Sequence, residues 1–284
     1  MKPKWRVYLR LGRVSNLPTV WTNCVAAVIL AGGRPGEAIF GLLLASMSLF
    51  YIAGMFLNDA FDQGFDRKYR PDRPIPANEI SGTAVYGIGF ALLAAGFVLL
   101  VNIGLLQDGF RGELLGWGIG LAGLIVYCDY RHKADPASPL IMALCRMMVY
   151  FASAAMISTA LTGRVLAGAG VLTAYLIGLT YVAKQENLSE VKNIWPLAFL
   201  AAPFIYAAPV LLRINFHSLQ YVFFFGWVIY SLSHLFKQGR KNIPRTVVSL
   251  IAGISLLDGV LIASVPEYAL WSWLGMAGFV LTLA

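Results

Sequence analysis

Asn58-Asp59-Ala60-Phe61-Asp62-Gln63-Gly64-Phe65-Asp66 is the stretch around which the rest of the chain is organised. It continues an apolar run, and its three aspartates are spaced i, i+3 and i+7. On a helix of 3.6 residues per turn, this spacing predicts that the three carboxylates share one face. Carboxylates this close together are costly in an apolar setting unless a cation joins them. The stretch therefore predicts a cation site where a helix leaves an apolar environment.

Oxygen donors of this kind suit Mg²⁺, which is commonly held by one or two carboxylates together with substrate phosphates. Arg67, Lys68, Arg70 and Arg73 follow at once and could meet the phosphate oxygens that the metal leaves free. Because prolines interrupt residues 70–76, we expect a loop that carries Arg73 back toward the aspartates. A mixed-charge hydrophilic loop is the plainer alternative, but the helical spacing and the preceding apolar run favour a diphosphate site.

The composition is that of a membrane protein. Of the 284 residues, 58% are hydrophobic and only 13% are charged, and the mean hydropathy is +0.70. A soluble domain carries about 25% charged residues, and a membrane span takes about 20 apolar residues. We therefore predict an all-α integral membrane protein whose residues 1–284 form a single polytopic domain. The predicted spans lie near residues 14–33, 37–58, 82–103, 112–128, 138–161, 165–183, 195–212, 217–236, 246–264 and 268–284.

The basic residues are distributed asymmetrically about these spans. Of the 22 lysines and arginines, 17 fall in the N-terminal tail and the four segments on its side of the membrane, and four fall on the opposite side. The positive-inside rule then predicts that the N-terminus and the motif loops are cytoplasmic, at a bacterial inner (plasma) membrane. Anionic lipid and phosphate account for the formal charge of +8, so no nucleic-acid partner is predicted.

Two further polar clusters occur on the same predicted membrane face. The fourth span leads into Tyr127–Lys133, whose tyrosines and cations suit an allylic cation and a phosphate. The alternative for this cluster is an interfacial aromatic belt with snorkelling cations. After the sixth span, Glu186 and Glu190 stand at i and i+4, flanked by Lys184 and Lys192. They form either a solvated helix face or a second metal-binding half.

Polar residues also stand at or inside the spans. Asn16 lies at the entry of the first span, as a helix cap or as a ligand contact. Arg146 lies about two turns inside the fifth span, where a charge is costly and tends to mark a substrate pathway or a paired site. Asp129 and Asp135 are candidate partners for Arg146, and substrate is the other candidate. Asp258, inside the ninth span, needs a partner or a proton.

Asn58, Asp59, Asp62 and Asp66 match the N-D-x-x-D-x-x-x-D signature of the UbiA superfamily of intramembrane prenyltransferases. The segment Asp72-Arg73-Pro74-Ile75-Pro76 follows it as in that family. The resemblance extends over most of the chain, because two weaker elements also recur at the expected spans.

The first of these elements is Tyr-x-x-x-basic, present as Tyr127 with Arg131, or with Lys133 as the alternative match. The second is the acidic motif after the sixth span, where Glu186 and Glu190 stand in place of the family's aspartates. The stretch from Ser138 to Arg146 resembles a bacterial subgroup encoded beside cyclitol-forming genes, which leaves a non-aromatic acceptor open.

The resemblance implies a bundle of nine transmembrane helices around a central cavity, whereas the spans counted above number ten, so we expect nine to ten. It also implies Mg²⁺-dependent transfer of a prenyl group from an isoprenoid diphosphate, through an allylic carbocation, to a lipophilic or small hydroxylated acceptor. Metal ligands are then expected among Asn58, Asp59, Asp62, Asp66, Glu186 and Glu190. Catalytic residues are expected at Asp62, Asp66, Arg73, Tyr127 and Lys133. Substrate contacts are expected at Asn16, Arg67, Lys68, Arg70, Arg73, Arg131, Lys133, Arg146 and Lys184.

The alternatives are a non-catalytic protein that binds an isoprenoid diphosphate and a transporter-like protein. A transporter would carry charged residues at mid-depth in several spans, whereas only Arg146 and Asp258 are charged there. The polar clusters gather instead at one membrane face, which favours an enzyme.

Overall fold

The computed structural model describes residues 4–107, 111–131, 137–184, 194–211, 218–236 and 242–284. Within these ranges the chain is helical and has no strand, as expected where the bilayer leaves every backbone polar group to be satisfied within the chain. The α-helices are α1 Lys4–Leu11, α2 Leu17–Leu30, α3 Ala38–Phe61, α4 Gln63–Tyr69, α5 Gly82–Leu106, α6 Gly112–Arg131, α7 Ser138–Ala155, α8 Gly163–Lys184, α9 Ala202–Leu211, α10 Ser218–Phe236, α11 Ile243–Ala263 and α12 Trp273–Leu283. Short 3₁₀ helices, η1 Val14–Asn16, η3 Trp195–Ala201 and η4 Pro266–Ser272, lead into α2, α9 and α12.

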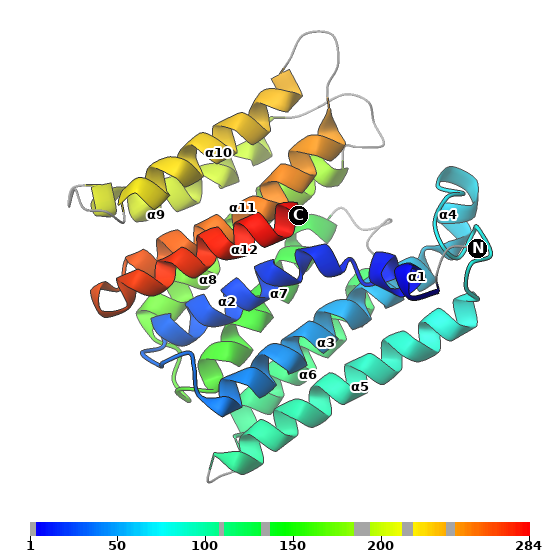
Figure 1. The fold of residues 1–284 in the computed structure, drawn as a ribbon, viewed down its shortest axis with the longest axis horizontal. Helices are drawn as coiled ribbons and strands as arrows, with labels where there is room; N and C mark the ends of the chain where they lie inside the picture. Colours follow the sequence, from blue (N-terminus) through cyan, green and yellow to red (C-terminus); the bar gives the residue numbers. More distant parts are fainter. Residues whose placement is uncertain (1–3, 108–110, 132–136, 185–193, 212–217, 237–241) are drawn as a thin grey trace.

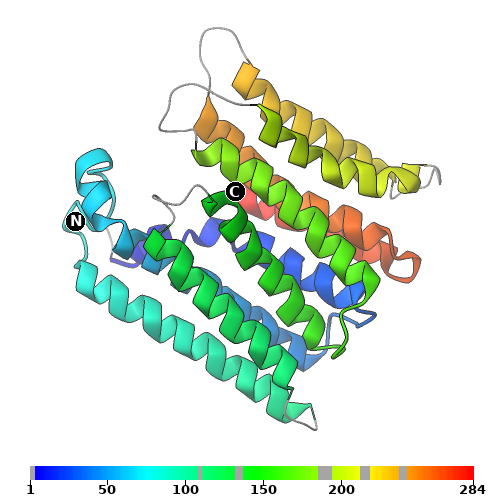
Figure 2. The ribbon, with the colours of Figure 1, turned by 180° about the vertical axis from the view of Figure 1, so that it is seen from behind.

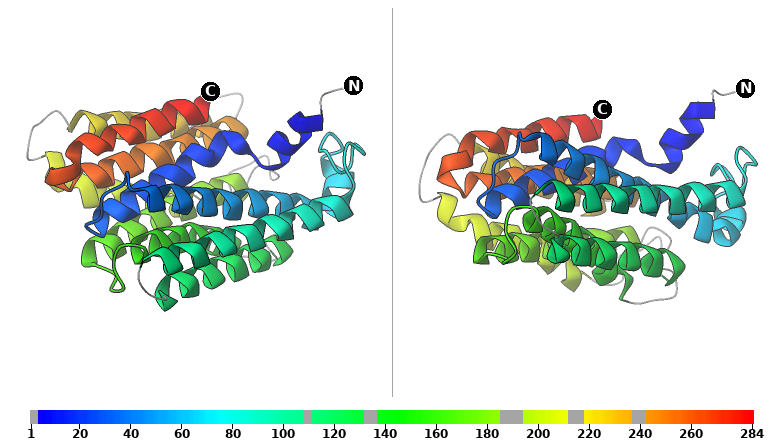
Figure 3. Two further views of the ribbon diagram at one scale, coloured as in Figure 1. Left: turned by 60° about the horizontal axis from the view of Figure 1, so that its bottom comes forward. Right: turned by 90° about the horizontal axis from the view of Figure 1, so that it is seen from below.

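The long helices lie side by side and run up and down through one bundle (Figure 1). Helices α3, α5 and α6 form one side of the bundle, and α9 and α10 form the opposite side (Figure 2). Between them stand α2, α7, α8, α11 and α12, so that α2 packs against both α7 and α11. Helices α1 and α4 project together at one end of the bundle (Figure 3). The aspartate stretch lies at that end, which we call the acidic end.

Each predicted span coincides with a helix or with a 3₁₀ helix that leads into one. The predicted count of nine to ten membrane crossings is nevertheless not confirmed. By length and hydropathy, six of the described helices could span a membrane: α3, α5, α7, α8, α10 and α11. Two further apolar stretches, Val14–Leu30 and Trp195–Pro209, are shorter. Each of these stretches begins with a 3₁₀ helix, and Pro209 inside α9 removes one backbone donor from the second.

Helices α11 and α12 approach each other through glycines. A Cβ atom built on Gly275 would lie 2.5 Å from the carbonyl oxygen of Ser255 and 2.7 Å from the Cα atom of Gly259. Small residues at such contacts let helix backbones come close in membrane proteins. The glycine at position 275 is therefore required for the packing of the last helix.

Gly275→Ala is expected to lower the melting temperature of the purified protein, because the added methyl group must push α12 away from α11. Overpacking of this kind costs typically about 1–3 kcal/mol. The matched control is Gly226→Ala on α10, where a Cβ atom meets nothing within 4 Å. Thermal unfolding in detergent should separate the two variants, and equal melting temperatures would contradict the packing argument.

A small apolar cluster fixes the segment that carries Arg73. Ile75 is buried against Val7 and Leu11 of α1, Phe56 of α3 and Val85 of α5. The Arg10 side chain of α1 also forms an ion pair with Glu79 in the same segment. The turns that follow α4 are therefore docked on the bundle, and they form the loop that the proline-rich sequence predicted.

Candidate functional site

The helix that carries the aspartates is interrupted at Asp62, where the sequence predicted a continuous helix to Asp66. Helix α3 ends at Phe61 and α4 begins at Gln63. Two backbone hydrogen bonds, Asp62 N–H to Asn58 O at 3.0 Å and Asp66 N–H to Asp62 O at 2.9 Å, carry the helical turn across the junction. The predicted spacing is therefore preserved, and all three aspartates are buried.

Arg73 joins two of these carboxylates. Its Nη1 atom lies 2.9 Å from Asp59 Oδ1 and 2.9 Å from Asp66 Oδ2. A single guanidinium nitrogen can reach both oxygens only if the carboxylates face the same side of the helix. The contact confirms that Asp59 and Asp66 share a face and that the segment after α4 returns Arg73 to them.

The second oxygen of Asp66 has no hydrogen-bond partner among the residues that the structure describes, although it is buried. A buried carboxylate oxygen without a partner is costly, and a cation is one group that offsets the cost. In the described ranges no three acidic, His or Cys side chains gather closely enough to hold a metal ion. Mg²⁺ does not require three, because it keeps waters and binds substrate phosphates. The donors at Asp66 and its neighbours therefore fit Mg²⁺ bound together with a phosphate.

Arg13 is a site residue that the sequence reasoning missed, because it was counted only as a charge of the N-terminal tail. Its Nη2 atom lies 3.4 Å from Asn58 Oδ1 and 3.4 Å from Asp59 Oδ1. Its backbone is left-handed, with φ 43° and ψ 48°, a conformation that non-glycine residues seldom adopt. This strained turn between α1 and η1 brings the side chain to the aspartates, and such strain is found at functional sites.

A cavity of about 210 Å³ extends from the acidic end into the bundle between α2, α3, α6, α7, α8 and α11. Arg13, Asn16 and Asp129 line it near the aspartates, and Arg146 lines it farther along α7. The other lining residues are mostly apolar and include Val20, Phe50, Leu121, Val149, Leu176 and Ile254. Polar groups thus occupy the entrance and one deeper position of an otherwise apolar space.

Asn16 occupies the N-cap position of α2, but its side chain makes no capping hydrogen bond. The cap expected from the sequence is therefore wrong for this side chain, which lines the cavity instead. Asp129 also differs from the expectation. Its Oδ1 atom lies 3.4 Å from the donating Nδ2 atom of Asn58, and it makes no ion pair with Arg146.

The structure does not bring every predicted residue to the cavity. Tyr127 is 47% exposed and lines a groove between α5 and α6, with Phe61, Phe90 and Tyr130. This groove lies on the outer side of α6, so the position of Tyr127 does not suit direct contact with a reacting group in the cavity. The alternative from the sequence, an interfacial aromatic belt, agrees with this position.

The predicted basic residues also differ in their positions. Arg67, Lys68 and Arg131 are exposed, and Arg70 is half-buried at the end of α4. Lys184 Nζ lies 3.2 Å from Ser138 Oγ and connects the end of α8 to the start of α7. Lys133, Glu186 and Glu190 lie outside the described residues.

These features define an integral membrane protein in which an aspartate cluster, bridged by Arg73, lies beside an otherwise apolar cavity. The chain belongs to the UbiA prenyltransferase family, whose model matches residues 19–284. The family resemblance stated from the aspartate signature is thereby confirmed.

Named relatives match about a third of the chain. A digeranylgeranylglyceryl phosphate synthase from Sulfolobus acidocaldarius is 28% identical over 105 residues, which are 37% of this chain and 38% of the relative. A synthase of the same name from Methanococcus vannielii is 32% identical over 34% of this chain and 36% of its own length. A 4-hydroxybenzoate octaprenyltransferase from Shewanella woodyi is 28% identical over 40% of this chain and 43% of its own length. The matched stretches therefore span less than half of each relative.

Solved structures match over most of the chain. One, from work on digeranylgeranylglyceryl phosphate synthase in membranes, has a TM-score of 0.61 at 18% identity and covers 94% of this chain and 99% of its own. The apo structure of a UbiA homolog from Aeropyrum pernix K1 has a TM-score of 0.54 at 15% identity and covers 94% of each chain. At these identities the matches establish the UbiA fold.

Proposed function

We propose that the protein transfers a prenyl group from an isoprenoid diphosphate to an acceptor within the membrane, as a single domain over residues 1–284. The observation that carries the proposal is the cluster of Asp59, Asp66 and Arg73, which contacts Arg13 at the lining of an apolar cavity. Such a site suits a molecule with a highly charged head and an apolar tail. The names of the relatives, two kinds of enzyme that make prenylated products, support the same reaction class.

Asn58, Asp62 and Asp66 would hold Mg²⁺, with Asp59 alongside, and Glu186 and Glu190 would hold a second ion. When bound, Mg²⁺ supplies positive charge that offsets the charge of the departing diphosphate. The protein's own cationic side chains would stabilise the remaining negative charge of the diphosphate. Further cations, chiefly Arg73 and Arg13 with Lys133 and Lys184, would bind the diphosphate oxygens as its bond to the prenyl carbon breaks.

The apolar cavity would protect the reaction. Loss of diphosphate leaves an allylic carbocation, which water would capture to give a prenyl alcohol. Apolar side chains such as Val20, Phe50 and Leu121 line the cavity and would keep water out. The acceptor would then attack the cation from the cavity and lose a proton. The asymmetry of the basic residues supports a cytoplasmic position for this acidic end, at a bacterial inner membrane.

A transfer assay tests the proposal. The purified protein in lipid nanodiscs would be given farnesyl or geranylgeranyl diphosphate, Mg²⁺ and a bacterial lipid and metabolite extract. Mass spectrometry should detect a new species that is heavier than an extract component by one prenyl group. If folded protein binds the diphosphates and yields no such species with either chain length, the non-catalytic binding role replaces the proposal.

Arg13→Gln is expected to weaken binding of geranylgeranyl diphosphate by about tenfold, the typical worth of a charge-assisted hydrogen bond. Isothermal titration in the absence of acceptor would measure the dissociation constant. Arg6→Gln is the matched control, because Arg6 is an exposed arginine of α1 whose guanidinium stacks on Trp5. Equal affinity in the two variants would remove Arg13 from the site.

A further inference from the structure

Arg146 is held in place by neutral side chains. Its Nη1 atom donates to Asn23 Oδ1 at 2.8 Å, and its Nη2 atom donates to Thr19 Oγ1 at 2.9 Å. Its guanidinium carbon lies 5.5 Å from the ring centroid of Tyr51 on α3. Among the ion pairs of the described residues, none involves Arg146. Among the residues that the structure describes, the guanidinium is therefore oriented by α2 and α3, and no carboxylate of those residues forms an ion pair with it.

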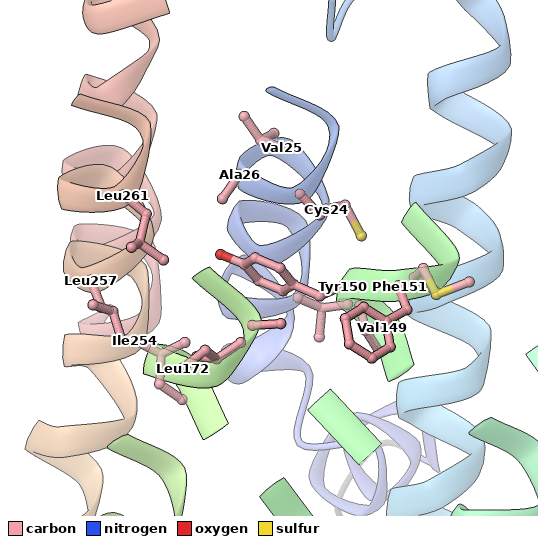
Figure 4. Close-up of a cluster of buried hydrophobic side chains, with 14 of the residues drawn as sticks. Cys24, Val25, Ala26, Val149, Tyr150, Phe151, Leu172, Ile254, Leu257 and Leu261 are labelled. Carbon is pink, nitrogen blue, oxygen red and sulfur yellow. The ribbon is translucent and has the colours of Figure 1, made fainter. Parts of the chain in front are cut away.

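The nearest carboxylate of the same network, Asp258, has donors of its own. It is fully buried on α11 and accepts hydrogen bonds from Thr22 at 2.6 Å, Asn23 Nδ2 at 2.7 Å and the Tyr150 hydroxyl at 2.8 Å. Figure 4 shows Tyr150 of α7 between α2 and α11, among apolar side chains. These three donors satisfy the carboxylate where it stands, so it does not require direct contact with Arg146.

Asn23 separates the two charges. Its amide oxygen accepts from Arg146 while its amide nitrogen donates to Asp258. The amide orientation follows from its neighbours, because a guanidinium can only donate and a carboxylate can only accept. An asparagine is thus suited to holding an arginine near a carboxylate without an ion pair between them.

The guanidinium has five N–H donors, and two contacts fix its orientation. Arg146 also lines the cavity, whose neighbouring walls include Phe50, Val149 and Leu176. A cation beside an apolar cavity is costly unless an anion meets it there. The arrangement is therefore that of a preformed anion site which faces the cavity.

This site is too deep for the diphosphate. Tyr51, which stacks with Arg146, precedes Asp59 by eight residues on α3, or about 12 Å at 1.5 Å per residue. Asn23 follows Asn16 by seven residues, and Asn16 marks the acidic end of the cavity on α2. A diphosphate bound beside Asp66 and Arg73 would therefore leave Arg146 free to bind a second molecule.

We propose that Arg146, oriented by Thr19 and Asn23, binds an oxyanion of the prenyl acceptor, either a carboxylate or a phosphate. The acceptor lies along the cavity with its anionic group at Arg146 and its nucleophilic atom toward the aspartates. The inference rests on the proposed prenyl transfer and names the class of acceptor. The competing interpretation is that Arg146 only supports the packing of α2, α3 and α7.

Binding of small probes to the purified protein in nanodiscs, without prenyl diphosphate, tests this site. Two charged and uncharged pairs would be titrated: 4-hydroxybenzoate against methyl 4-hydroxybenzoate, and glycerol 1-phosphate against glycerol. In at least one pair the anion should bind about tenfold tighter than its uncharged counterpart. The pair that shows the preference identifies the oxyanion as a carboxylate or as a phosphate.

The preference should disappear in Arg146→Met and survive in part in Arg146→Lys. Asn23→Asp tests the site with the arginine retained, because the new carboxylate would pair with Arg146 and should also remove the preference. Arg111→Met is the matched control, since Arg111 contacts the carbonyl oxygen of Ala155 and does not line the cavity. An anion preference that is absent from the wild type, or that persists in Arg146→Met, overturns the proposal.

The proposed function can fail separately. Anion binding that depends on Arg146, in a protein that releases no pyrophosphate from isoprenoid diphosphates, would keep the anion site and reject prenyl transfer. Pyrophosphate release with no anion preference in either pair would keep prenyl transfer and reject the anion site.

Discussion

Asp66→Asn is expected to lower pyrophosphate release from geranylgeranyl diphosphate by about 100- to 1000-fold, the range found when one electrostatic contact to a developing charge is removed. Asp66 Oδ2 contacts Arg73, and Oδ1 is the buried oxygen left for a cation. The substitution keeps the shape of the side chain but removes its charge. It therefore acts on both the guanidinium and the metal that this residue would hold.

Binding of Mn²⁺ in place of Mg²⁺, followed by electron paramagnetic resonance, gives a readout that does not depend on turnover. Asp66→Asn should lose bound Mn²⁺ measured in the presence of the diphosphate. Asp72→Asn is the matched control, because Asp72 is exposed in the next segment of the chain. Retention of most of the wild-type rate and of bound Mn²⁺ in Asp66→Asn would falsify the metal assignment.

Arg73→Met is expected to have the second large effect, on stability as well as on rate. Without the guanidinium, the buried Asp59 and Asp66 carboxylates face one another with no shared cation. Breaking a buried pair by removing one partner costs about 3–5 kcal/mol, and Arg73 is partly exposed, so the loss should fall near or below that range. Release of pyrophosphate should also fall by about 100-fold.

The stability effect has a specific signature. Mg²⁺ should raise the melting temperature of Arg73→Met more than that of the wild type, because a metal ion can take the place of the guanidinium between the carboxylates. Arg73→Lys should melt between the two proteins, since a single ammonium can also contact both oxygens. If Mg²⁺ stabilises the wild type and Arg73→Met equally, the two cations do not share one position.

Local spacing predicted the aspartate face well, because side chains three, four and seven residues apart meet on any helix. The turn that returns Arg73 was predictable because three prolines within residues 71–76 disfavour a continuing helix. The break at Asp62 was not predicted, because hydrogen bonds continue across it and no proline or glycine stands at that position.

Contacts between distant segments could not be read from the sequence. Arg13 reaches Asp59 only through an unusual backbone conformation at the end of α1. The sequence offered Asp129, Asp135 or substrate as the partner of Arg146. Asp135 lies outside the described residues, and in the described part Arg146 donates to Asn23 and Thr19 of α2. Those choices depend on which helix packs beside α7, and hydropathy does not encode helix neighbours.

The sequence also does not show which face of an apolar helix points into the bundle. Tyr127 and Cys128 are adjacent in sequence, but Tyr127 lines the outer groove and Cys128 lines the cavity. Because α6 is apolar on most sides, its sequence does not show which side meets the other helices. Only the structure showed that Tyr127 lines the outer groove and not the cavity.

The central claim is that the acidic end performs metal-dependent chemistry on a diphosphate. Pyrophosphate release from farnesyl and geranylgeranyl diphosphate by the purified protein in nanodiscs, with and without Mg²⁺ and with lipid extract as acceptor, tests it most directly. Our account predicts release that requires Mg²⁺. Folded protein that releases no pyrophosphate from either diphosphate, or releases it equally well without divalent metal, would contradict that account.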